Sequence, residues 1–262
     1  MTASARFEVS LPVAGEELAA RVFQPVGAGP WPGIVLCAEA TGVNSFIRGV
    51  GDLLASEGFT AIVPDYYRGA GPADPEDYSD VPALKEHINR LDFRRSTYDM
   101  LAAVDYLRTQ PSVHAEHVFT WGYCTGATLA MLAGCLDRTL AGTVLFYPSQ
   151  PVFESLNDLR PAHPRDLVWN HRAPMLLLYG DQDAAVPNAV QDDLRAELRR
   201  WNVPATTRVY AGAGHGFAGQ PSGSAYRAEA DRDSWALALS FARRHSATHD
   251  AVTGPSQPGC QG

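Results

Sequence analysis

The 262-residue chain lacks the features that would mark a membrane protein or a nucleic-acid-binding protein. No apolar run reaches the roughly 18 residues that are needed to cross a bilayer. The first residues, 1–10, contain no apolar core of the kind found in signal peptides. Positive charge is scarce, since 21 Lys and Arg face 29 Asp and Glu, and the resulting net charge of −8 repels phosphate backbones and acidic lipids. We therefore expect no nucleic-acid partner and no membrane association.

Cysteine is also sparse, and no pair of cysteines has a CxxC spacing. The four residues are Cys37, Cys124, Cys135 and Cys260, too few for a disulfide framework in a chain of this length. They indicate a reduced, cytoplasmic protein in which Cys37 and Cys135 are inert core residues. The densest group of possible metal ligands, HAEH at 114–117, does not have the zincin spacing H-E-x-x-H. We therefore expect no metal and no cofactor.

Short unbroken apolar runs alternate with amphipathic stretches along most of the chain. Unbroken apolarity is typical of strands that are buried on both faces, as in a parallel sheet. The expected strands are 33–38, 59–64, 118–121, 142–147 and 174–179. The expected helices are 46–56, 92–108, 125–136, 188–201 and 225–244. This alternation predicts an α/β fold with a doubly wound, mostly parallel sheet.

The two ends of the chain depart from this alternation. Residues 6–10 and 17–23 flank Gly15 and predict an antiparallel hairpin at the edge of the sheet. The last stretch, 246–262, is rich in Pro, Gly, Ser and Thr, so we expect a disordered tail. The sequence therefore predicts a single domain over 1–245 followed by this tail.

The sharpest motif is Gly122-Tyr123-Cys124-Thr125-Gly126, which follows an apolar strand and precedes a helical segment. It has the G-x-S-x-G pattern of a nucleophile elbow, with Cys124 in the position of the serine. Such a turn lifts the sulfur above the sheet at the start of a helix, where free N–H groups and the helix dipole favour the thiolate. The N–H of Thr125 would then face a developing oxyanion.

Two later segments carry an acid and a histidine that could complete a triad with this cysteine. Asp183 lies in a turn after an apolar strand, and His215 lies in the glycine-rich loop 212–217 after another strand. The order Cys…Asp…His is that of α/β-hydrolases. His215 would exchange the proton of the thiol, and Asp183 would hold its tautomer. Asp181 is the alternative acid, although its position is more typical of a residue that caps the turn.

Residues at the ends of two other strands are further candidates for the site. Glu39 ends the first central strand, where an acid is unfavourable unless it faces polar groups, and we expect it within reach of the cysteine. The neighbouring Ala40 would supply the second oxyanion N–H. Tyr66 and Tyr67 end the next strand, at the carboxyl edge where α/β sites form. Together with Arg68 and Phe217 these tyrosines are the predicted substrate-binding residues.

The chain resembles the dienelactone hydrolase (carboxymethylenebutenolidase) family of α/β-hydrolases. The matching pieces are Glu39 in AEATGVN, Pro64–Tyr67, Gly122–Gly126, Asp183 in GDQDAAVP and His215 in GAGHGF. The resemblance implies a triad of Cys124, His215 and Asp183 that is assisted by Glu39. It also implies that substrate binding shifts the glutamate toward a resting thiol, which becomes a thiolate, attacks a lactone carbonyl and forms an acyl-enzyme.

The sequence departs from this family where the substrate carboxylate would be bound. The family's arginine four residues after the catalytic histidine is replaced by Gly219, and the loop of its other arginine reads Tyr78–Val81. Arg68, Arg94 and Arg95 are the candidates to replace these arginines. If no arginine lines the pocket, a neutral ester, lactone or thioester becomes as plausible a substrate as a carboxylate.

The leading hypothesis is a cofactor-free hydrolase of a small lactone or ester that works through a cysteinyl acyl-enzyme. One alternative is a biosynthetic thioesterase or cyclase, in which an internal nucleophile captures the acyl group. Another is a non-catalytic ligand-binding protein on the same scaffold. Each of these three hypotheses requires only a small molecule as the partner. The sequence does not distinguish a monomer from a homodimer.

Overall fold

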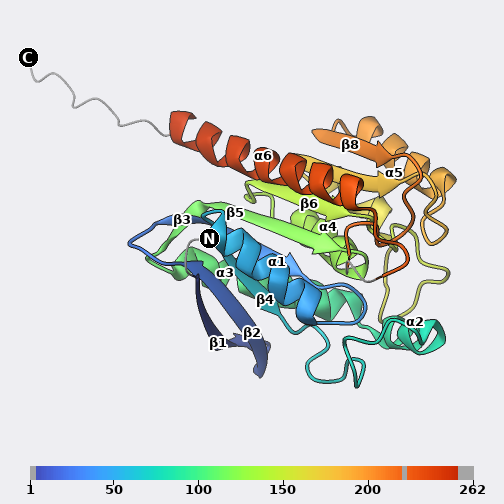
Figure 1. Cartoon of the computed structure of the whole chain (residues 1–262), viewed down its shortest axis with the longest axis horizontal. Helices are drawn as coiled ribbons and strands as arrows, with labels where there is room; N and C mark the ends of the chain where they lie inside the picture. The colour runs from blue at the N-terminus through green and yellow to red at the C-terminus, as the bar shows by residue number, and fades with distance from the viewer. Residues whose placement is uncertain (1–3, 220–222, 253–262) are drawn as a thin grey trace, which may run out of the picture.

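The computed structural model describes residues 4–219 and 223–252 of the chain. Its centre is one sheet of eight strands in the order β1-β2-β4-β3-β5-β6-β7-β8 (Figure 1). The strands are β1 (Ser4–Val13), β2 (Glu16–Pro25), β3 (Trp31–Cys37), β4 (Thr60–Pro64), β5 (Val113–Tyr123), β6 (Gly142–Phe146), β7 (Met175–Gly180) and β8 (Ala205–Tyr210). Strands β3 to β8 are parallel, whereas β1 and β2 form an antiparallel hairpin that joins the sheet at β4. The predicted α/β-hydrolase fold, with an N-terminal antiparallel edge hairpin, is confirmed.

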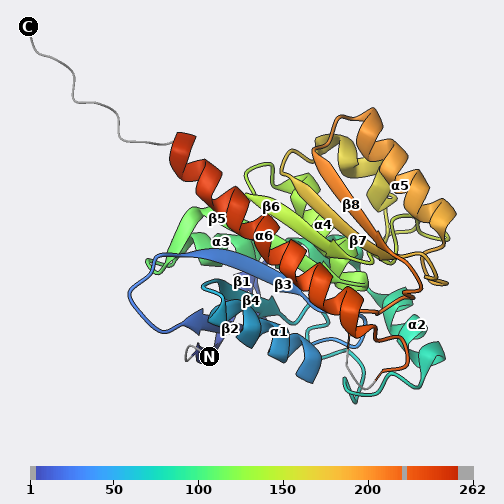
Figure 2. The ribbon, with the colours of Figure 1, turned by 45° about the horizontal axis from the view of Figure 1, so that its top comes forward.

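Helices cover both faces of this sheet. They are α1 (Ser45–Ser56), α2 (Val81–Arg90), α3 (Phe93–Thr109), α4 (Thr125–Leu136), the 3₁₀ helix η1 (Pro164–Asn170), α5 (Asn188–Arg200) and α6 (Ala228–Val252). Helices α1 and α6 lie on one face, and α3 and α4 lie on the other (Figure 2). The sheet is therefore enclosed, which explains why its central strands are apolar without alternation.

The central strands form the core of the molecule. Every residue of β4, β6 and β7 is buried. Because parallel strands all end at the same edge, the segments that follow β3, β5, β6, β7 and β8 meet there. Glu39, Cys124, Asp183 and His215 lie in these segments, which brings distant parts of the sequence together.

Three elements differ from the sequence-based expectation. Helix α2 was not predicted, and none of its residues is buried. The segment 114–117, which precedes the predicted strand 118–121, belongs to the long strand β5, whose register shifts where it pairs with β3. Helix α6 continues to Val252 and so includes the beginning of the predicted tail. The remainder of that tail, 253–262, lies outside the described residues.

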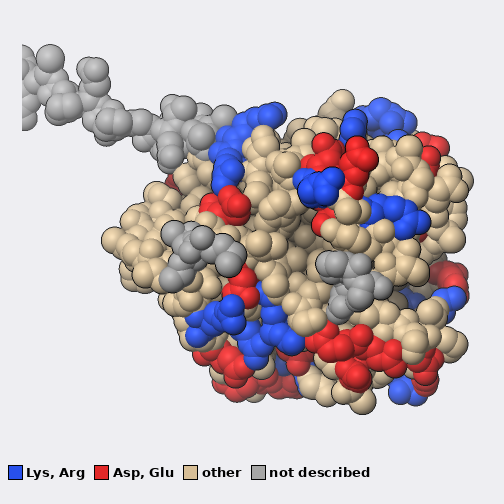
Figure 3. All heavy atoms as spheres, viewed as in Figure 1, with Lys and Arg blue, Asp and Glu red and all other residues tan. Residues whose placement is uncertain are grey.

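Two further features of the molecule are the character of its helices and the distribution of charge on its surface. Within residues 4–219 and 223–252, no helix combines the length and the apolar character needed to span a membrane. On the face that Figure 3 shows, basic and acidic side chains adjoin one another. Ion pairs of the molecule include Arg6–Asp52 and Arg48–Glu76.

Candidate active site

Cys124 occupies the turn between β5 and α4. Its backbone has φ 52° and ψ −120°, a conformation that an L-residue rarely adopts and that surrounding contacts must enforce. The Cys124 N–H donates to the Phe146 carbonyl at 3.0 Å, which ties the turn to β6. A side chain at Gly126 would bring its Cβ to 2.2 Å from the Ala38 carbonyl oxygen, and one at Gly122 would meet the Gly126 carbonyl oxygen at 2.3 Å. The elbow is thus possible only because glycine stands at both positions.

The sulfur of Cys124 begins a chain of two hydrogen bonds. Its Sγ lies 3.1 Å from Nε2 of His215. The Nδ1 of His215 lies 2.9 Å from Oδ2 of Asp183. The structure therefore brings together three side chains that follow β5, β8 and β7, in an arrangement suited to proton transfer from the thiol.

Asp183 is held by the backbone of its own turn. Its Oδ1 accepts from the N–H of Ala185 at 2.9 Å and from that of Val186 at 2.8 Å, and the side chain is fully buried. The other candidate acid, Asp181, has a different contact, because its Oδ1 accepts from the Gly212 N–H at 2.7 Å. Asp181 therefore ties the β7 turn to the loop after β8, and Asp183 is the carboxylate that reaches the imidazole.

The charges of Cys124 and His215 support each other. Burial by itself would raise the pKa of the Cys124 thiol, but the charge and the hydrogen bond of His215 outweigh it and hold that pKa below its ordinary value of 9.0. Burial would likewise lower the pKa of His215, but the Cys124 thiolate and Asp183 outweigh it and raise that pKa to about 10. The thiolate of Cys124 and the imidazolium of His215 therefore stabilise each other, which favours the ion pair over the neutral pair.

This pairing predicts the pH dependence of Cys124 alkylation by iodoacetamide. Only the thiolate reacts, so the rate should fall as the pH drops through the pKa of Cys124, which His215 holds below 9.0. The His215→Asn variant should need a higher pH than the wild type, because the charge and the hydrogen bond of His215 then no longer oppose the effect of burial on the thiol. Rates measured by mass spectrometry of the Cys124 peptide over about pH 5–10 would check this. Equal midpoints in the two proteins would contradict the ion pair.

Ala40 and Thr125 are the residues predicted to supply the oxyanion N–H groups; Ala40 lines the cavity together with Cys124, and Thr125 follows Cys124 in the chain. Thr125 is the first residue of α4, a position whose N–H has no partner within a helix. The peptide before Ala40 and the one after it are held by two buried tyrosines. Tyr66 donates its hydroxyl to the Glu39 carbonyl at 2.5 Å, and Tyr67 donates to the Ala40 carbonyl at 2.8 Å. These bonds fix the loop that carries the Ala40 N–H.

Glu39 lies beside the triad in the same cavity. Its side chain is buried, and its Oε1 accepts from the Tyr78 hydroxyl and from Nδ2 of Asn44, the latter at 3.1 Å. Burial raises the pKa of Glu39 above its ordinary value, although these two hydrogen bonds oppose the rise. The hydrogen bonds of the described residues include none between Glu39 and Cys124, and the negative charge of Glu39 opposes the lowering of the Cys124 pKa.

The cavity above Cys124 has a volume of about 490 Å³. Its walls are formed by 39–41, by 76–79 with Leu84, by Tyr147, and by residues 215, 216, 219 and 223–226. Tyr147 packs the edge of its ring against the imidazole of His215, with ring centroids 5.0 Å apart. A cavity of this size accommodates a small ligand.

The four predicted substrate-binding residues lie elsewhere. The hydroxyls of Tyr66 and Tyr67 are bound to backbone carbonyls, as described above, and neither ring lines the cavity. Arg68 pairs with the buried Asp99 and with Glu16. Phe217 is buried against Tyr147 and Tyr210. We therefore correct the prediction: the two tyrosines position the loop, and Arg68 and Phe217 support the fold.

Three aromatic residues of the cavity were missed by sequence reasoning. Tyr147 ends the predicted strand 142–147 and directly follows β6, so its place at a strand end was a usable signal. Tyr78 lies in the Pro/Gly/acidic loop of 69–80, which has no periodicity that would reveal its path. Tyr226 falls within the predicted helix 225–244, but α6 begins only at Ala228. Within the described part of the chain, no group of three or more His, Cys, Asp or Glu is arranged to hold a metal.

Comparison with known proteins assigns the family. Residues 18–246 match the family model described as "Dienelactone hydrolase family". A Salmonella typhimurium protein named "Putative carboxymethylenebutenolidase" is 30% identical over 236 residues, which cover 88% of this chain and 84% of that protein. A Bradyrhizobium protein named "Probable 2-oxo-3-(5-oxofuran-2-ylidene)propanoate lactonase" is 30% identical over 231 residues, covering 88% and 91%.

The fold agrees with a solved structure of similar sequence. The crystal structure of a "Putative Dienelactone Hydrolase" from Klebsiella pneumoniae matches with a TM-score of 0.83 and 30% identity, over 92% of this chain and 99% of that one. A "Dienelactone Hydrolase-like" phosphotriesterase from metagenomic libraries, at 22% identity and a TM-score of 0.76, shares the fold. On the matched family model and these relatives, the chain belongs to the dienelactone hydrolase family of α/β-hydrolases.

Proposed function

We propose that the protein hydrolyses small esters or lactones, without a cofactor, through a covalent acyl-enzyme on Cys124. The observation that carries this proposal is the hydrogen-bonded chain from the Cys124 sulfur through His215 to Asp183 at the wall of a cavity. A thiolate beside an imidazolium, both reachable from that cavity, is the arrangement that acyl transfer requires.

In the first half of the reaction, the Cys124 thiolate adds to the carbonyl carbon and forms a C–S bond. The oxyanion accepts hydrogen bonds from the N–H groups of Ala40 and Thr125. When the oxyanion collapses, the C–O bond to the leaving group breaks, and that oxygen takes the proton from Nε2 of His215. The products of this half are the free alcohol, or the opened lactone, and a thioester on Cys124.

In the second half, neutral His215 takes a proton from water as the water oxygen adds to the thioester carbonyl. Collapse breaks the C–S bond, restores the thiolate–imidazolium pair and releases the acid. A reactive thiol must stay reduced, and the three described cysteines are unpaired, so the proposal includes a reducing compartment such as the cytoplasm.

The acyl-enzyme is the species that tests this mechanism. Para-nitrophenyl acetate, mixed with the wild-type protein and quenched in acid, should give an acetyl thioester that peptide mass spectrometry locates on Cys124. Cys37 and Cys135 are internal controls, because both are buried and their burial raises their pKa values above that of a free thiol. Turnover of the ester with no thioester on Cys124 would overturn the proposal, as would thioesters only on the other cysteines.

A further inference from the structure

The charged residues around the cavity are of one sign. Three carboxylic acids line it, namely Glu39, Glu76 and Asp77, and none of the described lining residues is Lys or Arg. Residues 220–222, which the structure does not describe, are Gln, Pro and Ser and carry no charge. The thiolate and the imidazolium of the triad cancel each other, so the remaining charge of the wall is negative.

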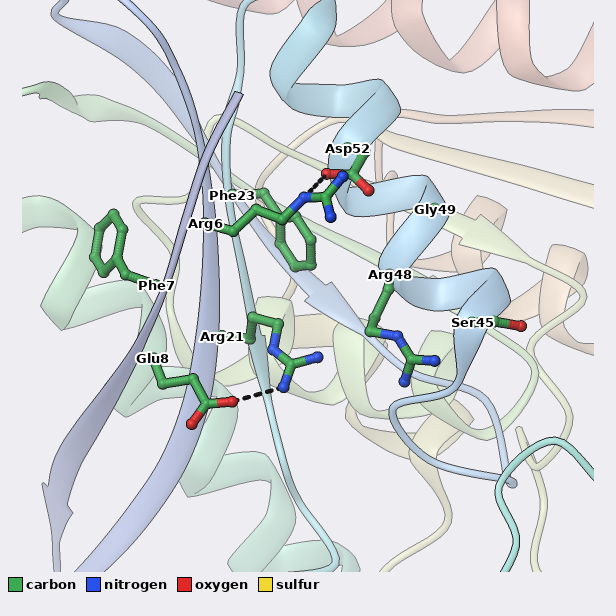
Figure 4. A pocket seen from close by; sticks show the side chains of 9 residues that line it. All are labelled: Arg6, Phe7, Glu8, Arg21, Phe23, Ser45, Arg48, Gly49 and Asp52. Carbon is green, nitrogen blue, oxygen red and sulfur yellow. Dashed lines mark hydrogen bonds and ion pairs between the residues drawn. The ribbon is translucent and has the colours of Figure 1, made fainter. Parts of the chain in front are cut away.

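Two guanidinium groups contact lining residues but face away from the cavity. Arg48 of α1 pairs with Glu76 at 3.1 Å, and it lies in a separate depression between α1 and the edge hairpin, across from Arg6 and Arg21 (Figure 4). This pair neutralises Glu76 but leaves Glu39 and Asp77 without a guanidinium partner.

The second guanidinium, that of Arg227, supports the opposite wall from behind. It donates to the carbonyls of Ser224 and Tyr226, both at 2.9 Å, and to the Gly212 carbonyl at 3.3 Å. Its side chain lines another depression, next to Arg208 and Asp233. Its Nε and Nη1 groups are engaged by these carbonyls, and its side chain does not line the cavity above Cys124.

The same walls carry aromatic rings. Tyr78, Tyr147 and Tyr226 all line the cavity. Aromatic faces attract cations, most strongly those that are weakly hydrated, such as quaternary ammonium groups. Rings combined with unpaired carboxylates therefore favour a ligand with positive charge and tolerate a neutral one.

We infer that this site selects neutral and cationic acyl donors and discriminates against acyl donors that carry a carboxylate. The inference rests on the proposed hydrolase function and names its substrate class. A carboxylate in the cavity would lie among like charges with no guanidinium to bind it, whereas an alkyl or trimethylammonium group would meet tyrosine rings. A like charge several ångströms away in such a partly desolvated site lowers binding by about tenfold.

Three matched esters test this inference. They are para-nitrophenyl hexanoate, the para-nitrophenyl monoester of adipic acid, and para-nitrophenyl hexanoate with trimethylammonium on its terminal carbon. We expect the wild-type kcat/KM for the anionic ester to be at least about tenfold below that of the neutral one, with the cationic ester equal to or above the neutral one. The difference should shrink at high salt.

A gain-of-charge variant provides the matched control. Leu84 lines the cavity from α2, a helix with no buried residue, so its substitution removes no core contact. Leu84→Arg should raise kcat/KM for the anionic ester relative to the neutral one by about tenfold, whereas Leu84→Met should leave the ratio as in the wild type. An unchanged ratio in Leu84→Arg would contradict the electrostatic origin of the selectivity.

Binding separates this inference from the proposed function. Affinities of the three esters for the Cys124→Ala variant, measured by calorimetry, should follow the same order without any turnover. If the anionic ester binds as tightly as the neutral one, the charge selectivity is wrong, whatever the catalytic result. If the order holds but the wild type hydrolyses none of the esters, the charge selectivity stands and the proposed hydrolysis is wrong.

Discussion

Replacing Cys124 with alanine is expected to reduce ester hydrolysis by about 10⁴–10⁶-fold, nearly to the background rate. The sulfur is the atom that would form the covalent bond, and within the described chain no other thiol reaches the cavity. Oxyanion donors and binding contacts would still act on a water attack, and they account for any residual rate. The measurement is kcat/KM for para-nitrophenyl hexanoate, compared with the wild type under the same conditions.

This substitution should leave the fold intact. Alanine keeps a Cβ at the same positive φ, so the strain in the elbow changes little, and the backbone bond to Phe146 remains. Cys135→Ala is the matched control, because it removes a buried thiol from α4, the helix that follows the elbow. The control should retain activity at a cost of about 1 kcal/mol in the free energy of unfolding. More than about one hundredth of wild-type activity in Cys124→Ala would exclude the sulfur as the nucleophile.

The fold could be predicted from the sequence because each buried strand leaves a recognisable pattern in its own stretch of sequence. Strands that are buried on both faces have unbroken apolar runs, and a parallel sheet gathers their ends at one edge. Glu39, Cys124, Asp183 and His215 lie in the segments that follow four of the strands, so they were expected near one another. The structure brings Cys124, His215 and Asp183 into hydrogen-bond contact and places Glu39 in the same cavity. Their chemical roles remain proposals.

The parts of the site that could not be predicted depend on tertiary contacts. Tyr66 and Tyr67 follow a strand end and so resembled pocket residues, but the sequence does not reveal that their hydroxyls reach two carbonyls 27 residues away. The contact between Tyr78 and Glu39 likewise depends on the path of the 69–80 loop, which has no periodicity. Arg68 had the chemistry of an anion site, yet the buried carboxylate of Asp99 binds it.

The structure shows which groups surround the cavity where the sequence departs from the family pattern. The sequence showed only that Gly219 stands where the family has an arginine. The structure adds that the carboxyl of Glu39 is bound by neutral partners, Tyr78 and Asn44, and that the neighbouring Asp77 has no guanidinium partner. No Lys or Arg among the described lining residues takes the place of the arginine that the family resemblance implies, and this supports the proposed difference in substrate class between this chain and its relatives.

Substituting Asp183 by asparagine is expected to lower kcat/KM by about 10²–10⁴-fold. The reason lies in how its carboxylate is held. Oδ1 accepts from two backbone N–H groups, of Ala185 and Val186, so an asparagine must place its own oxygen there. Its NH₂ group then faces Nδ1 of His215, which can no longer donate to it. The imidazole is forced to carry its proton on Nε2, facing the sulfur.

With its proton on Nε2, the neutral imidazole cannot accept the proton of the Cys124 thiol. A doubly protonated imidazolium would instead point its Nδ1–H at the NH₂ group of the asparagine, so that two donors would face each other. The Cys124 thiolate therefore loses its partner, so alkylation by iodoacetamide should slow together with hydrolysis. Asparagine is a better probe than alanine, because alanine would leave the two buried N–H groups without an acceptor at a cost of about 1–3 kcal/mol each. We therefore expect Asp183→Asn to change which nitrogen of His215 carries the proton and to leave the fold intact.

Asp181→Asn is the matched control for this prediction, since it makes the same chemical change two residues away. Asp181 accepts one N–H, that of Gly212, and an asparagine oxygen accepts that bond equally well. The control should lie within about threefold of the wild type in kcat/KM, as expected for a surface hydrogen bond remote from the reacting atoms. If Asp181→Asn lost activity and Asp183→Asn kept it, the carboxylate that holds the imidazole in solution would be Asp181. The tautomer of His215 would then be set by a contact other than the one at 2.9 Å from Asp183.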